Sequence, residues 1–100
     1  MMVRVLQSRL NQETARVRWS ELARHFAGGR LLRVAPRLDL VAVAAAVAED
    51  DAEQVNGWVT LGDVAPVTDL EAQTWQAADA VLWAVVVKPF VLVQSPTQDD

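Results

Sequence analysis

The chain has 100 residues and a formal net charge of −4, with 52% hydrophobic and 22% charged residues. This balance predicts one globular domain that buries its own core, not a disordered chain. Because there is no cysteine, disulfides, thiolate metal sites and a cysteine nucleophile are excluded. No apolar stretch approaches the about 20 residues that cross a bilayer. The start lacks the apolar segment of a secretion signal, so we expect a cytoplasmic protein with no membrane contact.

The charge is divided unevenly along the chain. Up to Arg37, eight basic residues face two acidic ones, whereas beyond it Lys88 faces eleven carboxylates. One interpretation is a basic surface for an anionic partner such as nucleic acid. We favour the interpretation that the two halves face each other, within the fold or across a dimer. A chain that is acidic as a whole gains little from non-specific attraction to nucleic acid.

The first third predicts a loose lead-in over residues 1–10, then a helix and a strand. Asn11 is a good N-cap, and apolar residues follow at helical spacing, namely Ala15, Trp19, Leu22, Ala23 and Phe26. Gly28 and Gly29 end this helix. No Lys-Ser or Lys-Thr follows the glycine pair, so it is not a phosphate-binding loop. Arg30 to Ala35 then reads as a strand that Pro36 closes.

Two further helices are expected in the middle of the chain. Asp39 caps the run from Leu40 to Ala48, which is apolar on all sides and therefore predicts a buried central helix. Asp51 and Gln54 then begin a third helix that continues through Leu61 and ends at Gly62. Asn56-Gly57 is a competing hairpin signal, but the polar residues before it are poor strand formers, so we favour the helix.

The last third predicts one more helix and two strands. Residues 63–67 form a connector with a short extended piece before Pro66. Thr68 and Glu71 then make a capping box for a fourth helix. We expect its inward face to carry Leu70, Thr74, Trp75 and Ala78.

Residues 80–87 fit either a strand or a helix, and their β-branched residues favour the strand. A second strand follows over residues 90–94. We expect a bulge at Pro89 and no tight hairpin, because the common two-residue turns need a positive φ before the proline. The polar tail over residues 95–100 is expected to be loose. Together these elements predict an α+β fold over residues 11–94, a helix-rich single domain with about four helices packed on a small two- to three-stranded sheet.

Several segments together resemble a known family, and they span about residues 10–94. They are Leu10-Asn-Gln-Glu-Thr-Ala15, Asp39-Leu-Val-Ala-Val-Ala44 with Ala48-Glu-Asp-Asp51, and above all Leu82-Trp-Ala-Val-Val-Val-Lys-Pro-Phe-Val-Leu-Val-Gln94. The chain is similar to the small bacterial proteins of domain-of-unknown-function family 2288, whose members often carry Trp where this chain has Phe90. The resemblance implies a bacterial, cytoplasmic, single-domain protein and brings no activity, cofactor or catalytic residue.

Three groups of polar residues are candidates for chemistry. Glu49, Asp50 and Asp51 could hold a divalent metal ion, although acids at a helix start also act as caps. Arg33 and Arg37 flank the start of the second helix and could bind an anion there. The single histidine, His25, could be a general base, yet a histidine in the last turn of a helix is also simply favourable. No catalytic residue and no cofactor is predicted.

The apolar segment from Ala80 to Val93 points to a protein partner. A strand without a polar face needs cover on both sides, which a domain of this size supplies only if its own helices lie over it. We therefore expect a homodimer interface formed by Trp83, Val85, Val87, Phe90 and Leu92. The favoured function is a non-enzymatic protein-interaction or accessory protein. The alternatives are a domain that binds a small ligand, an anion or a divalent cation, or nucleic-acid binding through the arginine-rich first third.

Overall fold

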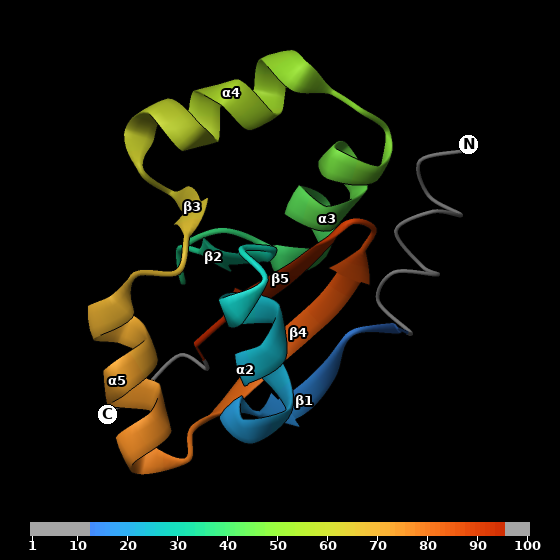
Figure 1. The fold of residues 1–100 in the computed structure, drawn as a ribbon. Coiled ribbons are helices and arrows are strands. Elements are labelled where there is room, and N and C mark those ends of the chain that lie inside the picture. Colours follow the sequence, from blue (N-terminus) through green and yellow to red (C-terminus); the bar gives the residue numbers. More distant parts are fainter. Residues whose placement is uncertain (1–12, 96–100) are drawn as a thin grey trace.

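The strands form one mixed sheet in a computed structural model that describes residues 13–95 (Figure 1). The order across the sheet is β1-β4-β5-β2-β3. Strands β2 and β5 run parallel, and the other neighbours are antiparallel. The strand bounds are Ala15–Arg18 for β1, Leu31–Val34 for β2, Val64–Pro66 for β3, Val81–Val87 for β4 and Phe90–Gln94 for β5.

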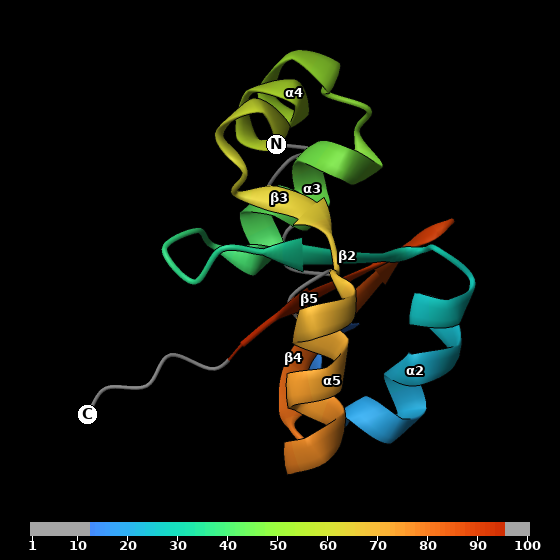
Figure 2. The ribbon, with the colours of Figure 1, turned by 60° about the vertical axis from the view of Figure 1, so that its left-hand side comes forward.

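Helices cover both faces of this sheet. Figure 2 shows α3 and α4 on one side of the strands and α2 and α5 on the other. Within the described residues there are four helices: α2 over Trp19–Ala27, α3 over Leu40–Ala48, α4 over Ala52–Leu61 and α5 over Asp69–Ala78. The expected α+β class and the helix count are confirmed. The expected sheet of two to three strands is wrong, because five strands pair.

Strand β1 was not expected, because its residues were assigned to the first helix. Ala15–Arg18 pairs antiparallel with Val81–Ala84 of β4, and the helix begins only at Trp19. Val17 packs inward while its neighbours are exposed, which is the alternation of an edge strand. The pairing partner lies more than 60 residues away, so a local pattern could not reveal it. Asn11 and the expected lead-in lie outside the described residues.

Strands β4 and β5 form the hairpin at the centre of the sheet. Both strands are confirmed, whereas the expected bulge at Pro89 is wrong. Val87 pairs with Phe90, so Lys88 and Pro89 alone make the turn. Their peptide bond is cis, and a tight turn with proline in its third position takes that form without a positive φ.

Local capping sets the helix boundaries as expected. Asp39 accepts a hydrogen bond from the Val41 amide at 3.0 Å, and Asp51 accepts one from the Gln54 amide at 3.3 Å. The capping box predicted before α5 is present in both directions. Gly62 ends α4 with a φ of 79°, in the left-handed region that glycine adopts without steric penalty. The starts of α3, α4 and α5 and the end of α4 are therefore set by nearby residues in the sequence.

The core consists of two clusters, one on each face of the sheet. On one face α3 packs on the sheet, through Val34, Leu40, Val43, Ala44, Ala45, Val64, Val85, Val87 and Leu92. On the other, α2 and α5 pack through Trp19, Leu22, Leu31, Val67, Ala72, Leu82, Ala84, Val91 and Val93. Three tryptophans of the helices contribute to these clusters. Trp19 is buried, while Trp58 and Trp75 are part-buried and pack against these clusters.

The inward face predicted for α5 is largely wrong. Ala72 is its buried residue and Trp75 packs beside it, whereas Leu70 is 72% exposed and Thr74 and Ala78 are also exposed. The helix contacts the rest of the fold mainly through α2, so it buries only a narrow strip. Helical spacing alone does not say how wide the buried strip is.

Candidate functional site

The five residues predicted to form a dimer interface divide into two groups. Val85, Val87 and Leu92 are 1%, 8% and 0% exposed and lie in the core cluster beneath α3. The expectation that they need a second chain for cover is therefore wrong. Trp83 and Phe90 are only part-buried at the border of the same cluster. The oligomeric state stays a prediction, and these two side chains are the ones a partner could still reach.

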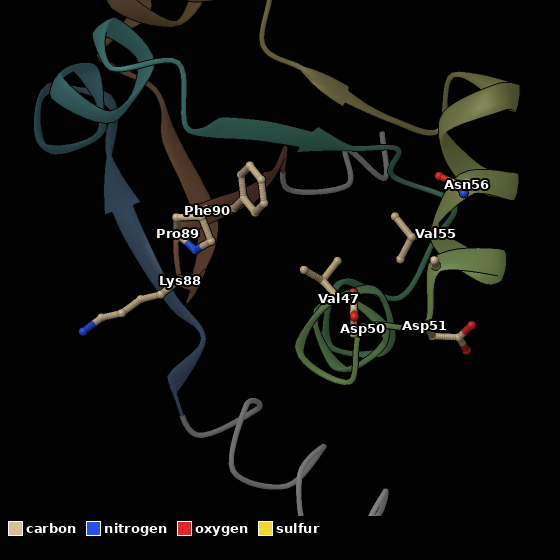
Figure 3. Close-up of a pocket in the computed structure, with 9 residues that line it drawn as sticks. Val47, Asp50, Asp51, Val55, Asn56, Lys88, Pro89 and Phe90 are labelled. Carbon is tan, nitrogen blue, oxygen red and sulfur yellow. The ribbon is translucent and has the colours of Figure 1, made fainter.

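Phe90 borders a hollow of about 410 Å³ between α3, α4 and the β4–β5 turn. Figure 3 shows Val47 of α3, Val55 of α4 and Phe90 of β5 pointing toward one another across it. All three side chains are part-buried, and Pro89 adds a further apolar wall. We call this hollow the docking groove. It is a concave apolar surface assembled from three separate elements.

The rim of the docking groove is acidic. Asp50 and Asp51 line it where α3 joins α4, and Glu49 and Glu53 flank them on the exposed surface. Among the described residues, Lys88 is the one basic residue that lines the hollow, and it lies in the hairpin turn. In Figure 3 the side chains of Asp51 and Lys88 point away from the hollow, so its interior stays apolar while charge surrounds it.

The acidic residues do not form the predicted metal site. In residues 13–95 no group of three or more His, Cys, Asp or Glu side chains is arranged to hold a metal ion. Asp51 is engaged as the N-cap of α4, and Asp50 stands just beyond α3 with a φ of 59°. Glu49, Asp50 and Asp51 are consecutive residues between α3 and α4.

Arg33 and Arg37 do not come together as an anion site either. The Arg33 Nε atom lies 2.8 Å from Oε2 of Glu71 in α5, on one face of the sheet. Arg37 donates to both carboxylate oxygens of Asp63. Because Asp39 already takes the Val41 amide, a carboxylate also occupies the start of α3. The interpretation that the basic and acidic halves face each other within the fold is confirmed for these two arginines.

His25 lies in the last turn of α2, as expected, and lines a second hollow beside β1 and β4. Burial and the nearby positive charges of Arg24 and Arg30 lower the pKa of this histidine below its ordinary value of 6.5. The side chain is therefore neutral at pH 7. This charge state is compatible with proton transfer and with ligand binding.

Sequence reasoning missed Val47 and Val55 as site residues. Their signal was faint: each is an apolar residue within a few positions of an acidic run, at the junction of two helices. Helix α4 buries none of its residues fully, and it leaves Val59 50% and Leu61 70% exposed. A helix that contributes so little to the core leaves apolar side chains available for contact with a partner.

Comparison with known proteins identifies the protein family. The sequence matches the family described as "Protein of unknown function (DUF2288)" over residues 5–95, so the chain belongs to that family and the resemblance is confirmed. The chain is also similar to a solved structure, the NMR solution structure of PA1075 from Pseudomonas aeruginosa. The two share 42% identity and a TM-score of 0.83 over 96% of this chain and 89% of that chain.

No curated protein matches the sequence. None of the helices within residues 13–95 is long and apolar enough to cross a membrane. The comparisons thus establish family and fold, and the case for a function depends on the geometry of the surface.

Proposed function

We propose that this is a non-enzymatic, cytoplasmic interaction protein that binds a basic segment of a partner protein in the docking groove. One observation carries the proposal: the groove has an apolar interior, formed by Val47, Val55 and Phe90, within an acidic rim. The matching ligand is a peptide segment with one large apolar side chain next to lysine or arginine.

The apolar interior supplies the binding energy. Val47, Val55 and Phe90 each keep part of their surface exposed, whereas Leu92 of the adjacent core is fully buried. Covering such surface with an apolar anchor is favourable by about 25 cal/mol per Å². Binding energy in protein interfaces concentrates where a large side chain fills a pocket of this kind. A single aliphatic or aromatic anchor is the occupant that this interior fits.

The acidic rim selects the charge of the partner. Asp50 and Asp51 line the groove against one Lys88, and the exposed Glu49 and Glu53 lie next to them in the sequence. Such a field attracts basic segments, accelerates their association and weakens as salt is added. Two copies of this chain meeting through the groove would bring their acidic rims together. We therefore favour a different partner protein over the homodimer through this surface.

Helix α4 can adapt to an occupant at little cost. It packs on the fold through part-buried Val55 and Trp58, with no side chain fully buried. Segments with few buried contacts shift or open with a small free-energy change. Movement of α4 relative to α3 would widen or narrow the groove, which suits a surface that accepts more than one peptide sequence.

The test is an NMR titration of the full chain with two synthetic peptides that share a tryptophan anchor, one flanked by lysines and the other by glutamates. We expect the lysine peptide to shift the signals of Val47, Val55 and Phe90 in a saturable way, and the glutamate peptide to bind at least tenfold more weakly. Val55→Lys should abolish the shifts. Val59→Lys is the matched control, since Val59 is 50% exposed on the same helix and does not line the groove.

Three outcomes would contradict the proposal. The first is equal binding of the two peptides. The second is a change of the groove signals caused by Arg4→Glu and Arg9→Glu alone, because the groove would then hold this chain's own first residues. The third is a mass in light scattering that doubles with concentration for the unaltered chain but not for Val55→Lys, since the occupant would then be a second copy.

A further inference from the structure

The second hollow lies on the opposite face of the sheet and has a volume of about 220 Å³. Its lining comes from β1, α2, β4 and β5. The volume is below the roughly 300 Å³ at which clefts for drug-sized ligands begin. A ligand for it has the size of a small metabolite.

The floor of this hollow is a part of the sheet that α2 does not reach. Helix α2 begins beside the start of β4, where the Trp19 amide donates to the Ala80 carbonyl at 2.8 Å. Nine helical residues extend about 14 Å, whereas the seven residues of β4 extend about 23 Å. Leu82 and Ala84 are covered, at 1% and 6% exposed, but Val86 on the same face is 53% exposed.

Val86 lies past the end of the β1 pairing, because β1 pairs with β4 only over Val81–Ala84, whereas Val86 pairs with Val91 of β5. Val86 lies in the hollow together with Val17 of β1 and Val91 of β5. These side chains make an apolar floor to which a small aliphatic or aromatic group can bind.

The wall of the hollow carries charges of both signs. Glu21, Arg24 and His25 line it from α2, at spacings that place them on one side of the helix. Neither of the ion pairs seen between described residues involves Glu21 or Arg24. The Nδ1 atom of His25 is buried and has no hydrogen-bond partner in the part of the chain that the structure describes. With Glu13, two carboxylates, one guanidinium and one neutral imidazole thus line the hollow around its apolar floor.

We propose that this hollow binds a small zwitterion with an apolar side group, the chemistry of a free aliphatic or aromatic α-amino acid. The carboxylate of the ligand pairs with Arg24, beside the neutral ring of His25. Its ammonium group pairs with Glu21, and its side group covers Val86. A simple anion would leave Glu21 without a partner in the site, and a simple amine would leave Arg24 without one.

The experiment is a titration of the full chain, followed by NMR, with leucine and three analogues that each lack one feature. These are 4-methylpentanoate without the ammonium, 3-methylbutylamine without the carboxylate, and glycine without the side group. We expect leucine to shift the signals of Val17, Val86 and Val91 in a saturable way and to bind at least tenfold more tightly than each analogue. No saturable shift up to about 10 mM, or equal binding of any analogue, overturns the proposal.

Variants locate the site. Arg24→Gln and Val86→Ser should each weaken leucine binding about tenfold. Val81→Ser is the matched control, because Val81 is 41% exposed on the same strand but lies outside the hollow. Equal weakening by Val81→Ser would contradict the assignment. Val55→Lys, which blocks the docking groove on the other face, should leave leucine binding unchanged, so the two proposals fail independently.

Discussion

The two faces of the sheet are covered by different kinds of side chain. On one face α3 packs with valines and alanines, and Ala44 and Ala45 are 0% and 2% exposed. On the other, α2 and α5 meet through aromatic rings: Trp19 lies with its ring centre 5.8 Å from that of Phe26 and 5.7 Å from that of Trp75. Small side chains bring a helix close to the sheet, whereas large rings bridge a wider gap.

This difference implies that the faces tolerate change differently. A larger side chain on the α3 face should lower the stability of the fold, because no space separates the helix from the strands. Removal of a ring from the aromatic face should lower the stability of the fold, because few residues fill a large volume there. Helix α4 contributes no fully buried residue to either core, and its part-buried Trp58 packs against one of them. The same fold therefore holds two packed layers and one peripheral helix, and substitutions can separate them.

The largest effect is expected from Trp19→Ala on the aromatic face. Trp19 is 3% exposed and contacts both other rings, so its loss leaves a cavity that its neighbours cannot close. The free energy of unfolding should fall by about 3–5 kcal/mol in urea denaturation. Trp58→Ala is the control on α4, where the ring is only part-buried. An equal or greater loss for Trp58→Ala would remove the distinction between the aromatic core and α4.

The α3 face should respond most to Ala44→Leu. Ala44 is 0% exposed, so the longer side chain must push α3 away from the sheet. We expect a loss of about 1–3 kcal/mol in the free energy of unfolding. Ala48→Leu, at an exposed position of the same helix, should change stability by less than about 0.5 kcal/mol. A neutral Ala44→Leu would mean that α3 does not lie as close to the sheet as the structure has it.

A smaller effect is expected at the start of α5. The Thr68 Oγ1 atom accepts the Glu71 amide at 3.1 Å, and Glu71 accepts the Thr68 amide at 3.0 Å in return. Thr68→Ala removes the first of these bonds and should lower stability by about 1 kcal/mol in thermal or urea denaturation. Thr60→Ala, at an exposed position inside α4, is the control. If both variants lose the same amount of stability, capping does not explain the loss in Thr68→Ala.

The smallest effect concerns pH and His25. Because burial, Arg24 and Arg30 lower the pKa of His25 in the folded chain, the unfolded chain binds a proton there more readily below pH 6.5. The stability associated with the neutral histidine is present above that pH and is lost as the pH falls through the folded pKa. Glu13 and Glu21 line the same hollow and carry negative charge there.

The measurement for His25 compares the native chain with His25→Gln in urea denaturation at about pH 5 and about pH 8. The native chain should lose slightly more stability between the two values than the variant, which cannot titrate at this position. A larger loss in the variant would show that the folded chain prefers the charged histidine.

What depends on local sequence was predictable. The Asp39 cap, the Thr68–Glu71 capping box and the stop at Gly62 act within one helical turn, so the sequence shows them directly. The strands at 81–87 and 90–94 could be predicted from their β-branched residues. The number of strands in the sheet could not be predicted in this way, because β1 becomes a strand only through pairing with β4.

The candidate sites depended even less on local patterns. Val47, Val55 and Phe90 come from three elements, and they meet around one hollow because α3 packs on the sheet and α4 packs on α3. Asp50 and Asp51 were singled out for their charge and assigned to a metal, whereas their position makes them the rim of an apolar groove. Hydrophobic spacing shows that a residue can be buried; it does not show which neighbour covers it.

The parallel pairing of β5 with β2 has a consequence for how the chain is made. Strand β5 lies between β4 and β2 and is the last strand of the described chain to leave the ribosome. Until it emerges, the nascent chain has the β1–β4 pair and the β2–β3 pair but nothing that joins them. The complete sheet therefore forms only after residues 90–94 have left the ribosome, and a nascent chain stalled before that point would display an incomplete sheet to the cell's chaperones and proteases.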